Sequence, residues 1–272
     1  MLQLKIPDTH VVKNTVKATL KDRRISAGIA GSIPYIMYLV LMAMYGVFAL
    51  LLTRNMLILT AVLSAVGMFI FLPVFLGVLR WFWRMAEGCD DPVSEIFYYF
   101  TNFFLYKRAV KCILFLTFKC AAGLFVCLLP YFVVNILSNA WIYQFLGTEI
   151  PLWVAGLAVV EAFLRLVGVI IGILVISRYY LFPALVVMDD NTLLLEAMHS
   201  SAVVSKRSFS YFFSLALSML GWIIISVFMI PIFYTAPLFF TAYVVHARYA
   251  IVNYNQNIDK KKNEEYDFQV DL

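Results

Sequence analysis

Long apolar runs alternate with short polar connections along most of the chain. Each run is close to the roughly 20 residues that a helix needs to cross a hydrocarbon core of about 30 Å. Apolar residues are continuous within the runs and do not alternate with polar ones, which indicates helices rather than strands. The pattern therefore predicts an all-α polytopic membrane bundle. Its six spans are predicted at residues 27–52, 56–80, 109–137, 152–178, 209–229 and 231–250.

Three segments beside the spans have the character of amphipathic helices that lie along a membrane surface. They are residues 9–24, 92–106 and 191–206. The second of them is rich in aromatic side chains, which suit the membrane interface. Residues 253–272 are polar and predict a solvated tail, so the spans and surface helices together form one transmembrane domain over residues 1–252.

Two of the surface segments match each other at a constant offset of 99 residues. Each segment begins after a pair of aspartates and ends on a Lys-Arg pair, and Asp91 before Pro92 predicts a helix N-cap. The N-terminal segment is a looser third copy. All copies would enter the membrane in the same direction, so the sequence predicts a parallel internal repeat. The paired positions are Asp90 and Asp91 with Asp189 and Asp190, and Lys107 and Arg108 with Lys206 and Arg207.

Basic residues lie almost entirely on one side of the six predicted spans. Of 21 Lys and Arg, 18 fall at the N-terminus, in the second and fourth connections or near the C-terminus. Arg54 stands alone on the other side. By the positive-inside rule, both termini lie in the cytoplasm. The net charge of +5 therefore reflects cytoplasmic connections, and no motif for binding nucleic acid accompanies it.

Composition supports a membrane location and excludes an ordinary soluble domain. The chain of 272 residues is 63% hydrophobic and 14% charged, which is more apolar surface than a soluble domain can bury. We find no Walker A loop, zinc-protease or hydrolase signature and no metal-ligand spacing, so we expect no catalytic residue, metal or cofactor.

The C-terminal third contains an ordered series of residues: Pro183, Ala184, Asp189, Asp190, Asn191, Glu196, Ala197, Met198, Ser200, Ser201, Gly221, Trp222, Pro231, Tyr234, Pro237, Arg248 and Tyr249. This order resembles a bacterial family of polytopic integral membrane proteins that is known only as a domain of unknown function. The likeness is best over residues 180–250, although Met198 and His199 stand where that family has a more regular amphipathic helix. The resemblance implies a multi-pass protein of the bacterial cytoplasmic membrane, and the family has no established substrate or functional residue to transfer.

Three ionisable residues lie within the predicted spans: Lys119, Glu161 and Arg165. Charges at such depth are costly and usually face a bundle interior. Glu161 precedes Arg165 by four residues, the favourable order for a helical ion pair. Counted from the basic residues at the span ends, Lys119 and Arg165 are both expected near the midplane.

Small and polar residues form stripes on several spans and predict close helix packing. The fourth span has a GxxxG pair, and the third and fifth spans have similar faces that we expect to converge with it. These positions are Gly123, Gly168, Gly172, Ser214, Ser218 and Gly221.

Two functions remain open from the sequence. In the favoured one, Glu161 neutralises Arg165, and the protein is a non-enzymatic accessory or scaffold bundle whose partners are the lipid bilayer and another membrane protein or transporter subunit. In the alternative, the one surplus positive charge of Lys119 and Arg165 receives an anionic lipid or solute, and the protein is a small transporter or lipid-handling protein.

Overall fold

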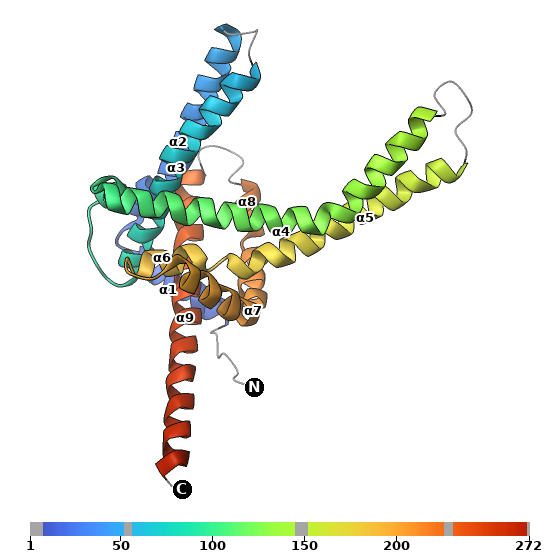
Figure 1. Cartoon of the computed structure of the whole chain (residues 1–272). Coiled ribbons are helices and arrows are strands. Elements are labelled where there is room, and N and C mark those ends of the chain that lie inside the picture. The colour runs from blue at the N-terminus through green and yellow to red at the C-terminus, as the bar shows by residue number, and fades with distance from the viewer. Residues whose placement is uncertain (1–7, 52–55, 145–151, 226–230, 271–272) are drawn as a thin grey trace. The chain divides into compact units, whose positions relative to one another are not determined.

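The computed structural model describes residues 8–51, 56–144, 152–225 and 231–270, and every regular element in these ranges is a helix (Figure 1). The all-α class is therefore confirmed. The single transmembrane domain predicted from the sequence is divided into two compact units. The first comprises Met1–Ile113 with Leu181–Leu272, and the second is Leu114–Tyr180.

The first unit contains most of the helices and the hydrophobic core. The α4 helix begins in this unit and continues into the second. The helices of the first unit are α1 (Thr9–Leu20), α2 (Arg24–Leu51), α3 (Met56–Ala86), the 3₁₀ helix η1 (Val93–Phe100), the start of α4 (Phe103–Gln144), α6 (Phe182–Met188), α7 (Leu194–Ser218), α8 (Leu220–Ile225) and α9 (Ile232–Val270).

Helix α9 lies at the centre of this unit and packs against α1, α2, α3 and α7. Its contact with α2 is close because α2 presents glycines there. A Cβ atom at Gly28 would lie 3.0 Å from the carbonyl oxygen of Phe233, and one at Gly31 would lie 3.0 Å from the nitrogen of Pro237. The two backbones approach to a distance that a larger side chain would prevent.

A glycine ends α3. Gly88 has a φ of +91°, and its N–H donates to the carbonyl of Met85 while the N–H of Cys89 donates to the carbonyl of Arg84. These two bonds form a Schellman motif, which satisfies the last carbonyls of the helix and requires the left-handed conformation that glycine adopts without strain. The connection that follows is thereby directed back along the end of α3.

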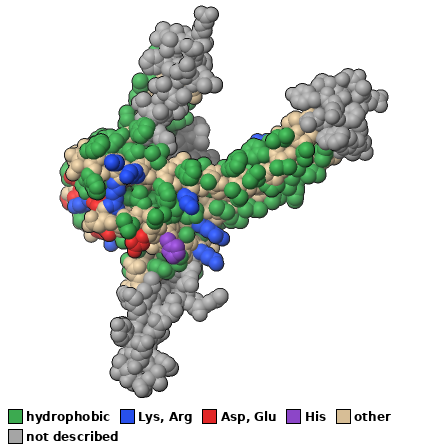
Figure 2. All heavy atoms as spheres, viewed as in Figure 1, with side chains coloured by type: hydrophobic (Ala, Val, Ile, Leu, Met, Phe, Trp, Pro, Cys, Tyr) green, Lys and Arg blue, Asp and Glu red, His purple; other side chains and the backbone are tan. Residues whose placement is uncertain are grey.

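The second unit is a helical hairpin made of the rest of α4, then α5 (Leu152–Ile176) and the short η2 (Ser177–Tyr179). Figure 2 shows hydrophobic side chains over most of the described surface of this hairpin. Phe118 is 72% exposed and Phe163 is 63% exposed, although water would strongly disfavour both. Two helices that are apolar on their outer faces indicate a lipid environment.

Four stretches of helix are long and apolar enough to cross a membrane: Arg24–Val47, Phe69–Ala86, Phe103–Asn139 and Gly156–Met188. They overlap the first four predicted spans and suggest a membrane protein. Helix α4 has 42 residues, which corresponds to about 63 Å, so part of it must tilt or extend beyond a hydrocarbon core of about 30 Å.

The structure differs from the sequence-based prediction at the last two spans. Helix α7 begins at Leu194 and contains only a short apolar stretch, Ser208–Ser218, before the helix ends with Met219 as its C-cap. Residues 226–229 of the predicted fifth span lie outside the described residues. The predicted sixth span is the first half of α9, whose apolar side chains are largely buried against neighbouring helices. Protein therefore covers surface that the sequence pattern assigns to lipid.

The surface segments also differ from prediction. Only the first resembles it, as α1. The second is a 3₁₀ helix over Val93–Phe100, with Pro92 at the N-cap position and Asp91 paired with Arg84. The third has no boundary at residue 206 and belongs to the continuous α7. The polar tail continues α9 as a helix to Val270, and only its last two residues lie outside the described part of the chain.

Candidate functional site

Two arginines at the end of α3 bind aspartates from two different connections. Arg80 Nη1 donates to Asp190 Oδ2 at 2.9 Å. One turn later, Arg84 donates through Nη2 to Asp91 Oδ1 at 3.1 Å, and its Nε lies beside the other carboxylate oxygen as an ion pair. The second pair is bidentate, which adds geometric specificity to the charge. The end of α3 thus binds Asp91 and Asp190, the second aspartate of each pair.

Tyr98 completes the first of these contacts. Its hydroxyl donates to Asp190 Oδ2 at 2.9 Å, and the guanidinium of Arg80 lies 3.7 Å from the centre of its ring. Burial raises the pKa of Tyr98, and the bond to Asp190 adds to this effect. The phenol therefore remains neutral and donates. Side chains of Arg80 and Asp190 are only 14% and 29% exposed, so water screens their attraction weakly.

Further arginines attach the neighbouring segments to the same region. Arg23 pairs with Asp90 at 3.3 Å and also donates to the carbonyl of Cys89. Arg108 Nη2 donates to the carbonyls of Asp189 and Thr192 at 2.9 and 3.1 Å. The Asp189 carboxylate accepts from the backbone N–H of Asn191 and from the Thr192 hydroxyl, and these bonds lower its pKa. The loop before α7 is thus fixed in one conformation.

We call Arg23, Arg80, Arg84, Asp90, Asp91 and Asp190 the arginine–aspartate cluster. Sequence analysis found its aspartates as marks of a repeat, but it missed Arg80, Arg84 and Tyr98. The available signal was the spacing of four residues between two arginines at the end of a span, which places both on one helix face. Lys107 and Lys206 are exposed instead, and the side chain of Arg207 lies outside the described residues.

In the hairpin, three glycines predicted for helix packing lie where α4 and α5 meet. A Cβ atom at Gly168 would lie 2.8 Å from the carbonyl oxygen of Cys127, and one at Gly123 would lie 3.2 Å from Val175. Gly172 likewise faces Leu124. This is the close approach that small residues permit between helices in lipid.

Glu161 is bonded within the hairpin by neutral donors. Asn135 Nδ2 donates to Oε1 at 2.7 Å, and Ser138 Oγ lies 3.3 Å from Oε2. Arg165 lies 5.8 Å from the centre of the Tyr131 ring, within the range of a cation–π contact. The ion pairs of the described residues do not include Glu161 with Arg165. Both residues therefore lie on adjacent turns, but each has a partner on α4.

Lys119 does not lie near Glu161 and Arg165. The glycine contacts set the register of the hairpin, with Gly123 beside Val175 and Tyr131 beside Arg165. Lys119 precedes Tyr131 by 12 residues, or about 18 Å along the helix. It is exposed and has no polar partner among the described residues. The estimate from span ends assumed that Arg108 and Arg178 lie at the same depth, and the register of the hairpin does not support this assumption.

The predicted packing residues of the fifth span belong to the first unit and form no comparable contact. Ser214 and Ser218 are exposed, and the Ser218 hydroxyl bonds to the carbonyl of Leu215 on its own helix. A Cβ atom at Gly221 would meet no described atom within 4 Å. The helix is interrupted at Met219, between α7 and α8, so these three residues do not lie along one face of a single helix.

Comparisons with known proteins do not assign this site. No family model, no curated protein and no solved structure matches the chain. The resemblance over residues 180–250 stays a prediction from the sequence.

Proposed function

We propose that the protein is a non-enzymatic accessory or scaffold protein of a bacterial cytoplasmic membrane. The observation that supports this most directly is the surroundings of Glu161, whose Oε1 accepts from Asn135 at 2.7 Å and whose Oε2 lies 3.3 Å from the Ser138 hydroxyl of the same hairpin. A carboxylate whose acceptors are already bonded within the chain serves structure better than substrate binding. The outer face of the hairpin remains apolar and is available to lipid or to another membrane protein.

The alternative, a transporter or lipid-handling protein with an anion site at Lys119, Arg165 and Glu161, has less support. That site needs two cations close together to leave a surplus positive charge. The hairpin register separates Lys119 from the level of Arg165 by about 18 Å, so one anion would meet Arg165 alone.

A parallel repeat also stays a prediction. Its support is that Asp91 and Asp190, equivalent at the offset of 99 residues, both accept bonds from arginines of α3. The segments after these aspartates differ, since one is a 3₁₀ helix and the other begins a long α-helix.

For topology, we propose that both termini lie in the cytoplasm and that the connections at Asn55 and Gly147 lie outside. Single cysteines at Asn55, Gly147 and Asn257 test this in a variant whose four native cysteines are replaced by alanine. An impermeant maleimide should label the first two in intact cells and Asn257→Cys only after the membrane is opened, because the basic connections hold that side inside. Labelling of Asn257→Cys in intact cells would contradict the proposed orientation.

The scaffold role predicts a protein neighbour on the outer face of the hairpin. A photo-crosslinking amino acid replaces Phe118 or Phe125 on α4, or Phe163 or Leu166 on α5, in the full chain in native membranes. All four side chains are exposed. We expect one helix face to give a protein adduct of a single mass, which mass spectrometry identifies, because a partner covers one face and lipid covers the other.

The matched control is Leu124, which faces Gly172 inside the hairpin and should crosslink only within the chain. Lipid adducts alone at all four exposed positions would contradict the scaffold role. Flux of an anionic solute into vesicles containing the purified protein, abolished by Arg165→Met, would favour the transporter instead.

A further inference from the structure

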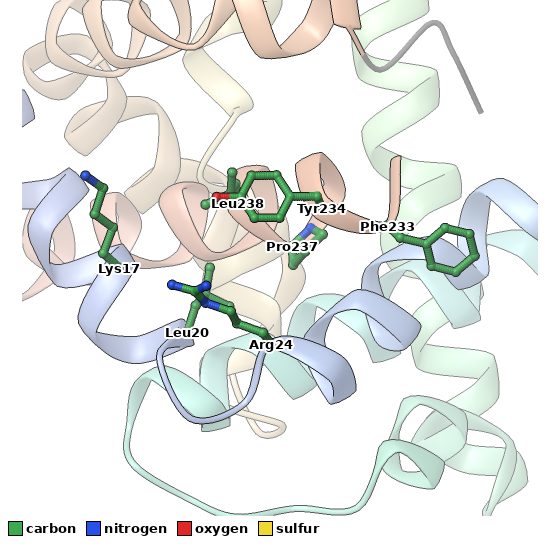
Figure 3. Close-up of a pocket in the computed structure, with 7 residues that line it drawn as sticks. All are labelled: Lys17, Leu20, Arg24, Phe233, Tyr234, Pro237 and Leu238. Carbon is green, nitrogen blue, oxygen red and sulfur yellow. The ribbon is translucent and has the colours of Figure 1, made fainter. Parts of the chain in front are cut away.

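A groove runs along α1 in the first unit, between this helix and the start of α9. One part has a volume of about 50 Å³ and lies between Lys17, Arg24, Tyr234 and Leu238 (Figure 3). The adjoining part has a volume of about 230 Å³ and is also lined by Lys17, Tyr234 and Leu238. The two parts are neighbours, because these three residues line both of them.

The position of the groove follows from the amphipathic pattern of α1. Val12, Val16 and Leu20 are buried and hold the helix on the core. Lys13 and Lys17 are one turn apart and line the groove from the same helix. Arg24, the first residue of α2, extends the basic wall, and Figure 3 shows Lys17 and Arg24 on the side opposite Tyr234, Pro237 and Leu238.

The opposite wall is apolar and aromatic. Met219 lies at the break between α7 and α8, and Leu238 belongs to α9. Trp222 and Tyr234 are both exposed at this wall, with ring centres 5.4 Å apart. Aromatic rings with a polar atom next to Lys and Arg are typical of the headgroup level of a membrane.

The charge in the groove has one sign. Lys13, Lys17 and Arg24 are the charged residues among those that line its two described parts, and no carboxylate lines either part. These cations are also absent from the ion pairs of the described residues. The arginines of the arginine–aspartate cluster, in contrast, have carboxylate partners. Three cations beside an apolar wall suit a ligand that has both an anionic and an apolar part.

We propose that this groove binds an anionic phospholipid, with the phosphate among Lys13, Lys17 and Arg24 and the upper part of an acyl chain against Met219 and Leu238. The volume fits this division. Pockets that enclose a whole small-molecule ligand usually have about 300–1,000 Å³, so this groove holds the headgroup and only the upper part of an acyl chain. The remainder of the acyl chains stays in the bilayer beside Trp222 and Tyr234.

Native mass spectrometry of the full chain in uncharged detergent tests the proposal, with phosphatidylglycerol and phosphatidylcholine as matched probes. We expect the wild-type chain to retain phosphatidylglycerol at least about tenfold more strongly. The variant Lys13→Gln/Lys17→Gln/Arg24→Gln should lose most of this preference. The control variant Lys21→Gln/Lys107→Gln/Lys206→Gln removes equal charge from exposed positions outside the groove and should retain the preference.

A second variant separates a lipid from a soluble phosphate. Trp222→Ala/Tyr234→Ala removes two exposed rings and should weaken lipid binding while leaving any binding of glycerol phosphate unchanged. A photoreactive phosphatidylglycerol should label the wild-type chain in α1, α8 and the first turns of α9. This labelling requires no substitution, so it remains informative if a variant fails to fold.

Equal retention of the two lipids by the wild-type chain would overturn the proposal, as would equal loss of preference in the groove and control variants. Competition by inorganic phosphate or glycerol phosphate at the strength of the lipid would show that the ligand is a soluble anion. Labelling confined to the α4–α5 hairpin would show that the lipid contact is nonspecific.

Discussion

Replacement of Gly77 by alanine should destabilise the first unit more than any other single methyl group added to it. Gly77 is buried in α3, and a Cβ atom there would overlap the backbone carbonyl of Ile96 in η1. Ile96 and Tyr99 are themselves buried, so η1 has little freedom to move away. Overpacking against backbone usually costs about 1–3 kcal/mol, and we expect about 3 kcal/mol or more for this overlap.

Gly46→Ala is the matched control, because no described atom of another segment lies within 4 Å of a Cβ at that position in α2. Alanine stabilises a helix by up to about 1 kcal/mol relative to glycine, so this control should be neutral or slightly stabilising. The thermal midpoint of the full chain in detergent measures both variants. Equal midpoints for the two would show that α3 and η1 do not meet at Gly77.

Apolar continuity was enough to predict the helical class and the first four membrane-crossing stretches. Those runs include α4 and α5, whose outer faces carry exposed apolar side chains in the structure, as expected of helices that face lipid. Apolar continuity alone does not distinguish a membrane span from a core helix in α9, because a helix buried in protein has the same apolar composition as one that faces lipid. His246 and the hydroxyls of Thr235 and Thr241 are buried there, and this polar content is the local sign of a protein core.

Local motifs predicted the candidate sites less well, since their partners are distant in sequence. The spacing of Glu161 and Arg165 favours an ion pair, yet Asn135 and Ser138 compete for the same carboxylate from the neighbouring helix. Asp91 was predicted as an N-cap, but its carboxylate binds Arg84 instead, because the Schellman motif at Gly88 turns the chain back towards the end of α3. The glycine stripe of the hairpin was predictable, since close approach depends only on the small residues themselves.

Replacement of Asp190 by asparagine should remove much of the stability that the arginine–aspartate cluster provides. Asparagine keeps the shape of the side chain but leaves the charge of Arg80 without a counter-ion beside the ring of Tyr98. Loss of one partner from a pair of this burial should cost about 2–4 kcal/mol, whereas loss of both partners costs less because apolar groups can fill the space. We therefore expect Arg80→Met/Asp190→Leu to be more stable than Asp190→Asn.

Asp90→Asn is the control for this prediction, because it makes the same chemical change in the other connection, one position before Asp91, which is the equivalent of Asp190. The Asp90 side chain is 89% exposed and its bond to Arg23 is screened by water, so the thermal midpoint should change little. Added salt should reduce the small effect at Asp90 and leave the effect at Asp190 nearly unchanged, because a screened interaction depends on ionic strength and a buried one does not. Equal sensitivity of the two variants to salt would show that water reaches Arg80 and that the connection before α7 is not held by this pair.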